Sequence, residues 1–478
     1  MITLRILSSE DKEKIHQKTL EVLENTGIEV RNDEGVHILK RAGCEMEDNT
    51  ARISSSLVEE CIKKAPSSFE LFTREGSKSF TIGTDNVVFN PGSSAASIRD
   101  RRTGVIRKGT LSDVIELVKV VDSLENLKAQ STALIPSDVP EVSSDFYRLY
   151  LSLKYSSKPI ITGAFGKEGI GDMKKLLESV VGGEEELTGK PLAVFDCCPL
   201  SPLVWSDISC QNLIDCANAS IPSQIVPAPL MGATSPVTLS GTIVQTNVEI
   251  LSGIVISQLV NPGTPVIYGG APAVLDMKYA TPRFSAMESI LTACASSEMG
   301  RNYGLPTNAY LGVSESKLED AQSGYETTLG LTLGALSRVN VISGPGMLAF
   351  LNCQSLEKLV IDNELCGSAL RLLRGVNLED IGDIVDLIGA VGPTGNYLGQ
   401  KHTSKRFRTE HFMPSDLISR LTEGVWSEKG SKSILDRAKE RVSSILQDYS
   451  QDSQDKSVEL EDTFKQLMEK YRSQPNSR

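Results

Sequence analysis

The stretch NVVFNPGSS (86–94) is an apolar run that ends in polar and small residues, and the amphipathic helical pattern LSDVIELVKVVDSL (111–124) follows it. Seven further apolar runs are each followed by a helical pattern: LKAQSTALI (127–135), PIITGAF (159–165), PLAVFD (191–196), SQIVPAPL (223–230), TPVIYGG (264–270), PTNAYLG (306–312) and NVISGP (340–345). Nearly continuous apolar runs suit a parallel sheet that is buried on both faces. Eight strand–helix units, repeating every ~35–45 residues, predict an α/β fold with a (β/α)8 TIM barrel over residues 86–375.

The segments on either side of this repeat have a different character. Residues 1–85 combine helical patterns, one starting near Ser8, with strand-like runs at 69–72 and 80–82, which predicts an N-terminal α+β cap. Residues 376–478 are charged and helical, which predicts a C-terminal helical extension with its last ~25 residues solvated or loosely docked. An open doubly wound sheet is the alternative architecture, but no GxGxxG follows the first strand.

Charge and cysteine content narrow the class of protein. The formal net charge is −12, so nucleic acid and anionic membrane surfaces are poor partners. Nine cysteines without a CxxC pair fit a reducing cytoplasm. The N-terminal residues MITLRILSSEDKEKIHQ do not resemble a signal peptide, and no run approaches the ~20 apolar residues of a membrane span. We therefore expect a cytoplasmic protein.

The carboxyl ends of the predicted strands indicate where a site would lie, because barrel enzymes carry their active sites there. The residues found there are mostly glycine, serine, asparagine and aromatics. The four histidines, His16, His37, His402 and His411, all lie outside the strand ends, and neither HExxH nor GxSxG occurs. Zinc hydrolysis and acyl-enzyme chemistry are therefore disfavoured, and no metal is expected.

Each candidate also has an ordinary structural interpretation. Tyrosines placed like Tyr268 and Tyr310 are more often strand-end core than ligands, and Asp196 is equally compatible with a cap of the following helix. Gly344 and Gly346 suit a tight turn, although the turn after the eighth strand of a barrel is a recurrent phosphate site. Glu326 lies near the start of a helix, and His402 lies in what reads as a surface loop.

Four long segments resemble one known family: QLVNPGTPVIYGG (258–270), GLPTNAYLGVSESKLEDAQSGYE (304–326), ISGPGMLAFLNCQSLEKLVIDNELCG (342–367) and GPTGNYLGQKHTSKRFR (392–408). They are similar to the trimethylamine methyltransferase family of corrinoid-dependent methyltransferases, in order and spacing over nearly the whole chain. The resemblance implies a barrel and methyl transfer from an amine to the cobalt of a partner corrinoid protein. No pyrrolysine is written here, which implies the branch that demethylates quaternary amines such as glycine betaine, carnitine, proline betaine and γ-butyrobetaine.

A quaternary ammonium needs no general acid, because its leaving group is a neutral tertiary amine. No catalytic acid or base is therefore assigned. The substrate-binding candidates are the aromatics Phe89, Tyr268, Tyr310 and Phe350 for cation–π contact, Asp196 and Glu326 for charge, and Asn90 and Gln322 as donors. Gly344, Gly346 and His402 are assigned to the corrinoid side.

Two other functions remain open at this point. The chain could act on a different methylated amine or methyl donor, or be a non-catalytic barrel that binds betaine-like ligands. Family analogy and the helices outside the barrel favour a homo-oligomer.

Overall fold

Eight short parallel strands form the centre of the computed structural model, which describes residues 2–379, 381–449 and 457–472. They are β6 (Val88–Asn90), β9 (Gln130–Ser131), β10 (Ile160–Thr162), β11 (Ala193–Cys197), β13 (Ser223–Ile225), β15 (Val266–Tyr268), β18 (Asn308–Tyr310) and β19 (Val341–Ser343). Their pairings run β9-β10-β11-β13-β15 and β18-β19-β6. Parallel bridges from Phe89 to Leu127 and from Tyr268 to Thr307 join the two groups, so the pairing closes into a circuit.

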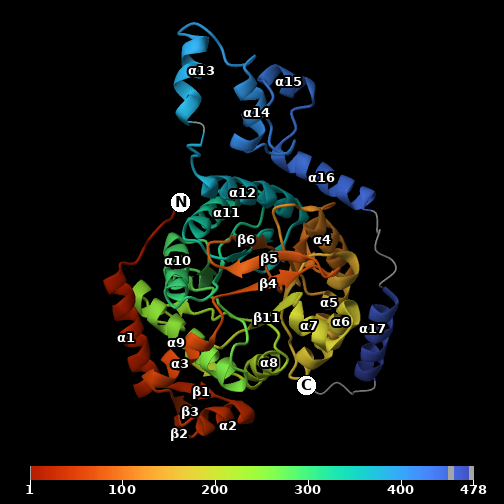
Figure 1. Ribbon diagram of the computed structural model, residues 1–478. Helices are drawn as coiled ribbons and strands as arrows, with labels where there is room; N and C mark the ends of the chain where they lie inside the picture. The colour runs from red at the N-terminus through yellow and green to blue at the C-terminus, as the bar shows by residue number, and fades with distance from the viewer. Residues whose placement is uncertain (1, 380, 450–456, 473–478) are drawn as a thin grey trace.

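A helix follows each of these strands. The helices are α4 (Leu111–Ser123), α5 (Ser144–Tyr155), α6 (Gly169–Val181), α8 (Asp207–Asn218), α9 (Leu239–Val260), α10 (Met287–Asn302), α11 (Ala321–Leu336) and α12 (Leu356–Arg374), with the short α7 (Glu184–Gly189) after α6. Figure 1 shows them surrounding the strands in chain order. The predicted α/β class is confirmed, and each predicted strand run overlaps an observed strand.

The amino end of the strand ring is filled with apolar side chains. Five strands contribute one each, and Ala129 directly precedes β9: Val88, Ala129, Ile161, Val194, Ile267 and Val341. Leu71 of β4 (Ser68–Phe72) and Ile82 of β5 (Lys78–Gly83) complete this cluster. The β4–β5 hairpin crosses the centre of the view in Figure 1, so it closes this end of the ring.

The remaining N-terminal elements cover α9. They are α1 (Ser9–Asn25), β1 (Ile28–Val30), α2 (Asp33–Arg41), β2 (Glu45–Glu47), β3 (Thr50–Arg52) and α3 (Ser55–Lys64). Asn247 of α9 donates to Thr19 Oγ1 of α1 at 2.9 Å, and β1 pairs with β12 (Val204–Trp205) from the loop after β11. With α1 outside it and strands inside, α9 needs no polar face.

This covering corrects one expectation from the sequence. Among the described residues, α9 is long and apolar enough to cross a membrane, contrary to the prediction that no run approaches that length. However, 78% of its most apolar window is buried inside the molecule, which is typical of a core helix.

Several loops after the strands form small sheets that the sequence did not predict. One sheet joins β7 (Ser97–Arg99), β8 (Ile106–Lys108), β20 (Met347–Leu348) and β21 (Cys353–Gln354). Another joins β14 (Leu230–Met231), β16 (Ala273–Asp276) and β17 (Thr281–Arg283). Strands of two to four residues carry too little periodicity to be recognised in a sequence. These small sheets order the loops at the carboxyl end of the strand ring.

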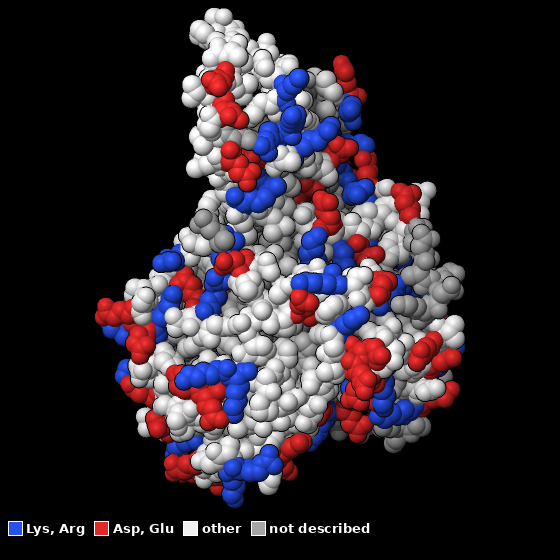
Figure 2. Space-filling model, viewed as in Figure 1, with Lys and Arg blue, Asp and Glu red and all other residues white. Residues whose placement is uncertain are grey.

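The C-terminal helices fall into two groups. α13 (Ile384–Val391), α14 (Lys401–Glu410) and α15 (Glu423–Glu428) project beyond α12 in Figure 1, and α16 (Ile434–Asp448) returns along α12 and α4. On the side drawn in Figure 2, blue and red residues are interspersed over this projection and over the main body.

α17 (Ser457–Arg472) packs on α5 and α6. Its Phe464 ring stacks on Tyr150 at 4.1 Å, and Leu460 and Leu467 are buried. The prediction of a loosely docked end is therefore wrong for α17, whose apolar stripe has a partner surface. The rest of that prediction falls on 450–456 and 473–478, outside the described residues.

Candidate functional site

A layer of polar side chains lies inside the strand ring at its carboxyl end. Asp196 of β11 is in register with Gln224 of β13, and Tyr310 of β18 is in register with Ser343 of β19 and Asn90 of β6. Residues in register on parallel strands face the same side of a sheet. Asp196 lies two residues after Val194 and therefore faces the same interior. The structure thus brings together three sequence candidates, Asn90, Asp196 and Tyr310.

Asp196 is the acidic group of this layer. Its Oδ1 accepts a hydrogen bond from Gln224 Nε2 at 2.9 Å, and its Oδ2 lies 3.4 Å from the Tyr310 hydroxyl, which donates to it. Burial raises the pKa of Asp196 to about 7, although both hydrogen bonds oppose the rise. Asp196 as a residue is still partly exposed and Cys198, two residues on, is exposed, so this part of the ring lies close to solvent. A cation bound there would favour its ionised form.

Tyr310 links the acid to the first loop of the ring. Its hydroxyl lies 2.8 Å from Ser93 Oγ, and its ring packs in a small apolar cluster with Val226 and Ala271. Burial, followed by the nearby Asp196, raises the pKa of Tyr310 well above its usual value. Tyr310 is therefore a neutral hydrogen-bond donor whose ring forms part of an apolar wall.

A second chain of hydrogen bonds fixes Asn90. Ser343 Oγ donates to Asn90 Oδ1 at 2.8 Å, Asn308 Nδ2 lies 3.0 Å from Ser343 Oγ, and Asn90 Nδ2 donates to the carbonyl of Pro91 at 2.8 Å. Sequence reasoning did not select Gln224, Asn308, Ser343 or Ser93 as ligands. A polar residue within an otherwise apolar buried strand was the available signal, because such a group needs a partner.

Two aromatic candidates do not face this interior. Phe89 is fully buried in the cluster that contains Val114 and Leu117 of α4. Tyr268 belongs to the cluster with α9, where its hydroxyl donates to Asn247 Oδ1 at 2.9 Å. The prediction that both aromatics line the site is wrong. A strand buried on both faces shows no alternation in its sequence, so its inward-facing positions cannot be identified from the sequence alone.

Phe350 occupies an unusual turn after β19. Three consecutive residues, Ala349, Phe350 and Leu351, have φ of 50°, 63° and 64°, in the left-handed region. Such residues cost roughly 1–2 kcal/mol each unless other contacts hold them. The Nζ of Lys317 lies 4.2 Å from the centre of the Phe350 ring. The Lys317 ammonium group therefore already contacts the aromatic ring of Phe350.

Gln322 and Glu326 organise the loop between β18 and α11. Glu326 accepts hydrogen bonds from Gln322 Nε2 at 2.8 Å, Ser314 Oγ at 2.6 Å and the Glu315 N–H at 2.9 Å. Glu315 in turn accepts from the N–H of Ser285 at 2.8 Å, and burial raises the pKa of Glu315. The hydrogen-bond donors around Glu326 thus stabilise the loop. No group of three or more His, Cys, Asp or Glu side chains placed to hold a metal occurs within the described ranges.

The three residues assigned to the corrinoid side are not gathered at one place. The Gly346 N–H donates to Asp362 at 2.7 Å, and the Gly344 N–H donates to the Asn90 carbonyl at 3.3 Å, so both turn amides have partners within the fold. A side chain at Gly346 would place its Cβ 2.5 Å from Leu359, and its φ is 86°, which explains the glycine. His402 lies on α14, in the projecting group of helices.

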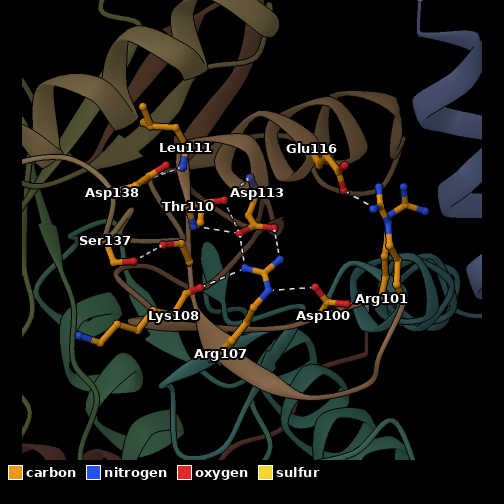
Figure 3. A network of polar contacts seen from close by, with 12 residues as sticks. Asp100, Arg101, Arg107, Lys108, Thr110, Leu111, Asp113, Glu116, Ser137 and Asp138 are labelled. Atoms are coloured by element: carbon orange, nitrogen blue, oxygen red, sulfur yellow. Dashed lines mark hydrogen bonds and ion pairs between the residues drawn. The ribbon is translucent and has the colours of Figure 1, made fainter.

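The loop that carries Ser93 is fastened by an ionic network, drawn in Figure 3. Arg107 donates to both oxygens of Asp113, at 2.6 and 2.8 Å, and to Asp100 at 2.9 Å. Asp113 also forms a capping box with Thr110 at the start of α4. A bidentate arginine–carboxylate pair has a fixed geometry, so the network restrains this loop.

Exposed apolar side chains surround the carboxyl end of the ring. They lie in the loops after β6, β9, β10, β11, β13, β15 and β18, and they are Val105, Val142, Phe165, Leu200, Val237, Met277, Tyr279 and Leu318. Within this set, the largest exposed fractions are those of Met277 at 68% and Val237 at 67%. Grouped exposed apolar residues are typical of a surface that meets a partner. We call this set the apolar rim.

Comparison with known proteins identifies the family. The model of the trimethylamine methyltransferase (MTTB) family matches residues 1–471. The chain belongs to this family. It is 33% identical over 446 residues to the glycine betaine methyltransferase of Desulfitobacterium hafniense (strain Y51), covering 93% of this chain and 92% of that one.

Other relatives carry a different substrate name. The trimethylamine methyltransferase MttB of Desulfitobacterium hafniense (strain DSM 10664 / DCB-2) is 32% identical, covering 92% of this chain and 89% of that one. The crystal structure of the Methanosarcina barkeri monomethylamine methyltransferase (MtmB) has a TM-score of 0.47 and 12% identity, covering 91% of this chain and 92% of that one. The two Desulfitobacterium relatives thus differ in the methylated amine that they are named for, and the class of this protein is that of a methyltransferase.

Proposed function

We propose that this chain is a (β/α)8-barrel enzyme that transfers a methyl group from a quaternary amine, glycine betaine or a related betaine or carnitine, to Co(I) of a corrinoid carried by a partner protein. The observation that carries the proposal is the Asp196–Tyr310 pair, a partly exposed acidic residue and a neutral aromatic donor inside the carboxyl end of the ring. Family membership supplies the reaction class.

The residues at the site suit a substrate that is already cationic. Ionised Asp196 attracts the ammonium, and the Tyr310 ring with its apolar neighbours presents a surface that methyl groups can contact. When the C–N bond breaks, its electron pair stays on nitrogen, so a neutral tertiary amine leaves without a proton. The partner's cobalt supplies the nucleophile. The role of this chain is to hold the methyl group in line and exclude water, which can lower a barrier by ~7–11 kcal/mol.

The apolar rim supports docking of the partner at this same end. A corrinoid ring is large and flat, and its protein must approach closely enough for cobalt to reach a methyl group inside the ring of strands. Exposed apolar side chains on loops after seven of the strands offer such a contact surface. Phe350 in its strained turn is retained as a further aromatic candidate. Gly344, Gly346 and His402 have no observation that favours a corrinoid role.

Other expectations stay predictions. They are the division into residues 1–85, 86–375 and 376–478, a homo-oligomeric state, a cytoplasmic location, and the lack of a metal or of a nucleic-acid partner. Light scattering of the purified protein would test the homo-oligomeric state. Metal analysis of tag-free protein would test the lack of a metal.

The direct test mixes the purified chain with reduced cobalamin and follows methyl-Co(III) formation by its absorbance. The donors are glycine betaine, γ-butyrobetaine, carnitine and trimethylamine. Turnover with a quaternary donor, lost in Asp196→Asn but kept in a surface control such as Lys14→Gln, is the expected result. Turnover with trimethylamine alone would overturn the quaternary assignment, and binding without turnover would indicate a non-catalytic barrel.

A further inference from the structure

Arg148 of α5 is fully buried and only partly hydrogen-bonded. Its Nη1 donates to the carbonyl of Thr132 at 2.8 Å and lies 3.4 Å from Ser94 Oγ. Its Nε and Nη2 are buried and have no hydrogen-bond partner among the residues that the structure describes. A guanidinium has five N–H donors, and leaving buried donors unpaired is costly. An anion with two oxygens is the partner that fits such a fork.

Arg148 lies at the functional end of the ring. Ser94 follows β6, Thr132 follows β9, and Phe165 follows β10, with its ring centre 4.5 Å from the Arg148 guanidinium carbon. Phe165 is 42% exposed, so a partly exposed ring lies between this buried cation and solvent. The guanidinium therefore lies beneath a partly exposed ring at the carboxyl end of the strands.

The neighbouring acid does not complete the coordination of Arg148. The oxygens of Asp145 accept hydrogen bonds from the N–H groups of Phe165 at 2.9 Å and Phe146 at 3.2 Å. Burial lowers the pKa of Arg148 to about 10, and the charge of Asp145 opposes this shift. Arg148 therefore remains cationic at neutral pH, with its free donors unused.

Two consecutive serines connect this cation to the acidic group. Ser93 contacts the Tyr310 hydroxyl, which donates to Asp196, and Ser94 contacts Arg148. Neighbouring Cα atoms are about 3.8 Å apart. At one end of the strand ring, Ser93 thus leads through Tyr310 to the Asp196 carboxylate, and the adjacent Ser94 contacts the buried Arg148 guanidinium. This arrangement complements a zwitterion, a small molecule with a fixed positive and a fixed negative charge.

We infer that Arg148 binds the carboxylate of a betaine-type substrate while Asp196 and Tyr310 face its ammonium group. This inference rests on the proposed function for the identity of the ammonium, and it adds the discriminating residue. Arg148 would then select betaines and carnitine over choline, which has the same ammonium group but no carboxylate. Asp196 would contribute to binding of both kinds of ligand.

The test measures binding by calorimetry, with glycine betaine, γ-butyrobetaine and choline as the probes. We expect Arg148→Met to weaken betaine binding on the order of 10- to 100-fold, as for a lost charged hydrogen bond, and to leave choline binding unchanged. Arg148→Lys, which keeps the charge without the fork, should restore part of the affinity. Equal losses for betaine and choline would assign Arg148 a purely structural role and overturn the inference.

A measurement on the unmodified chain covers the case in which Arg148 variants do not fold. The methyl ester of each betaine keeps the ammonium and removes the negative charge, so the wild-type protein should bind it at least tenfold more weakly. Equal binding of acid and ester would overturn the inference. If carboxylate selectivity appears but no methyl reaches Co(I), the proposed reaction fails while the Arg148 site stands.

Discussion

The two ends of the same eight strands enclose different side chains, apolar at the amino end and polar at the carboxyl end. At the amino end the interior side chains are Val88, Val194 and Val341, sealed by Leu71 and Ile82 of the hairpin. Two residues further along each strand, on the same face, stand Asn90, Asp196 and Ser343. A distance of about 6.6 Å along a strand therefore separates an apolar plug from a polar site. Stability and function occupy adjacent layers of the same ring.

The largest expected effect comes from opening a cavity in the apolar layer. Ile267→Ala should lower the free energy of unfolding by about 2–5 kcal/mol, because Ile267 is fully buried and its truncation removes apolar contacts and leaves a cavity. Urea unfolding measures this change. Methyl transfer per folded molecule should change little.

Ile267→Val is the matched control and should cost only about 0.5–1.5 kcal/mol. A large loss of activity in Ile267→Ala, with the fold intact, would show that the two layers are not separable.

In the polar layer, a substitution should lower ligand binding without lowering stability. Asp196→Asn should weaken binding of a quaternary amine on the order of 100-fold, because the ionised partner of the ammonium is lost. Stability should stay equal or rise, since a buried carboxyl group is replaced by an uncharged amide. Calorimetry and thermal unfolding of the same preparation give both values.

Unchanged affinity in Asp196→Asn would remove Asp196 from the site. A strong loss of stability would instead place it in the structural layer with Val194.

The polar layer should also show a smaller effect, which depends on pH. The pKa of Asp196 is raised to about 7, so the neutral form prevails below that pH. Affinity for a quaternary amine should therefore rise by about tenfold from pH 6 to pH 8 and level off above. The unfolded carboxyl binds its proton more weakly than the folded one, so the contribution of Asp196 to stability falls as pH rises from about 4 to about 7.

Asp196→Asn should flatten the affinity profile and remove this part of the pH dependence of stability. Other buried acids with raised pKa, such as Glu249, contribute to stability in both proteins and cancel in the difference. A wild-type affinity that is independent of pH would show that Asp196 does not face the ammonium.

Long apolar runs, helix caps and long motifs are local features. They were enough to predict the strand–helix repeat, the positions of the eight strands and the family. The sequence also correctly placed Asp196 and Tyr310 at strand ends. It could not decide whether Phe89 and Tyr268 face inward or outward, since both faces of the strands are buried and only the register of the closed ring sets which side is which. Arg148 was missed for a related reason: a charged residue on a helix reads as solvated until the tertiary structure buries it beside Ser94 and Thr132. Only the closure of the strand ring places Arg148 at the same end as Asp196 of β11.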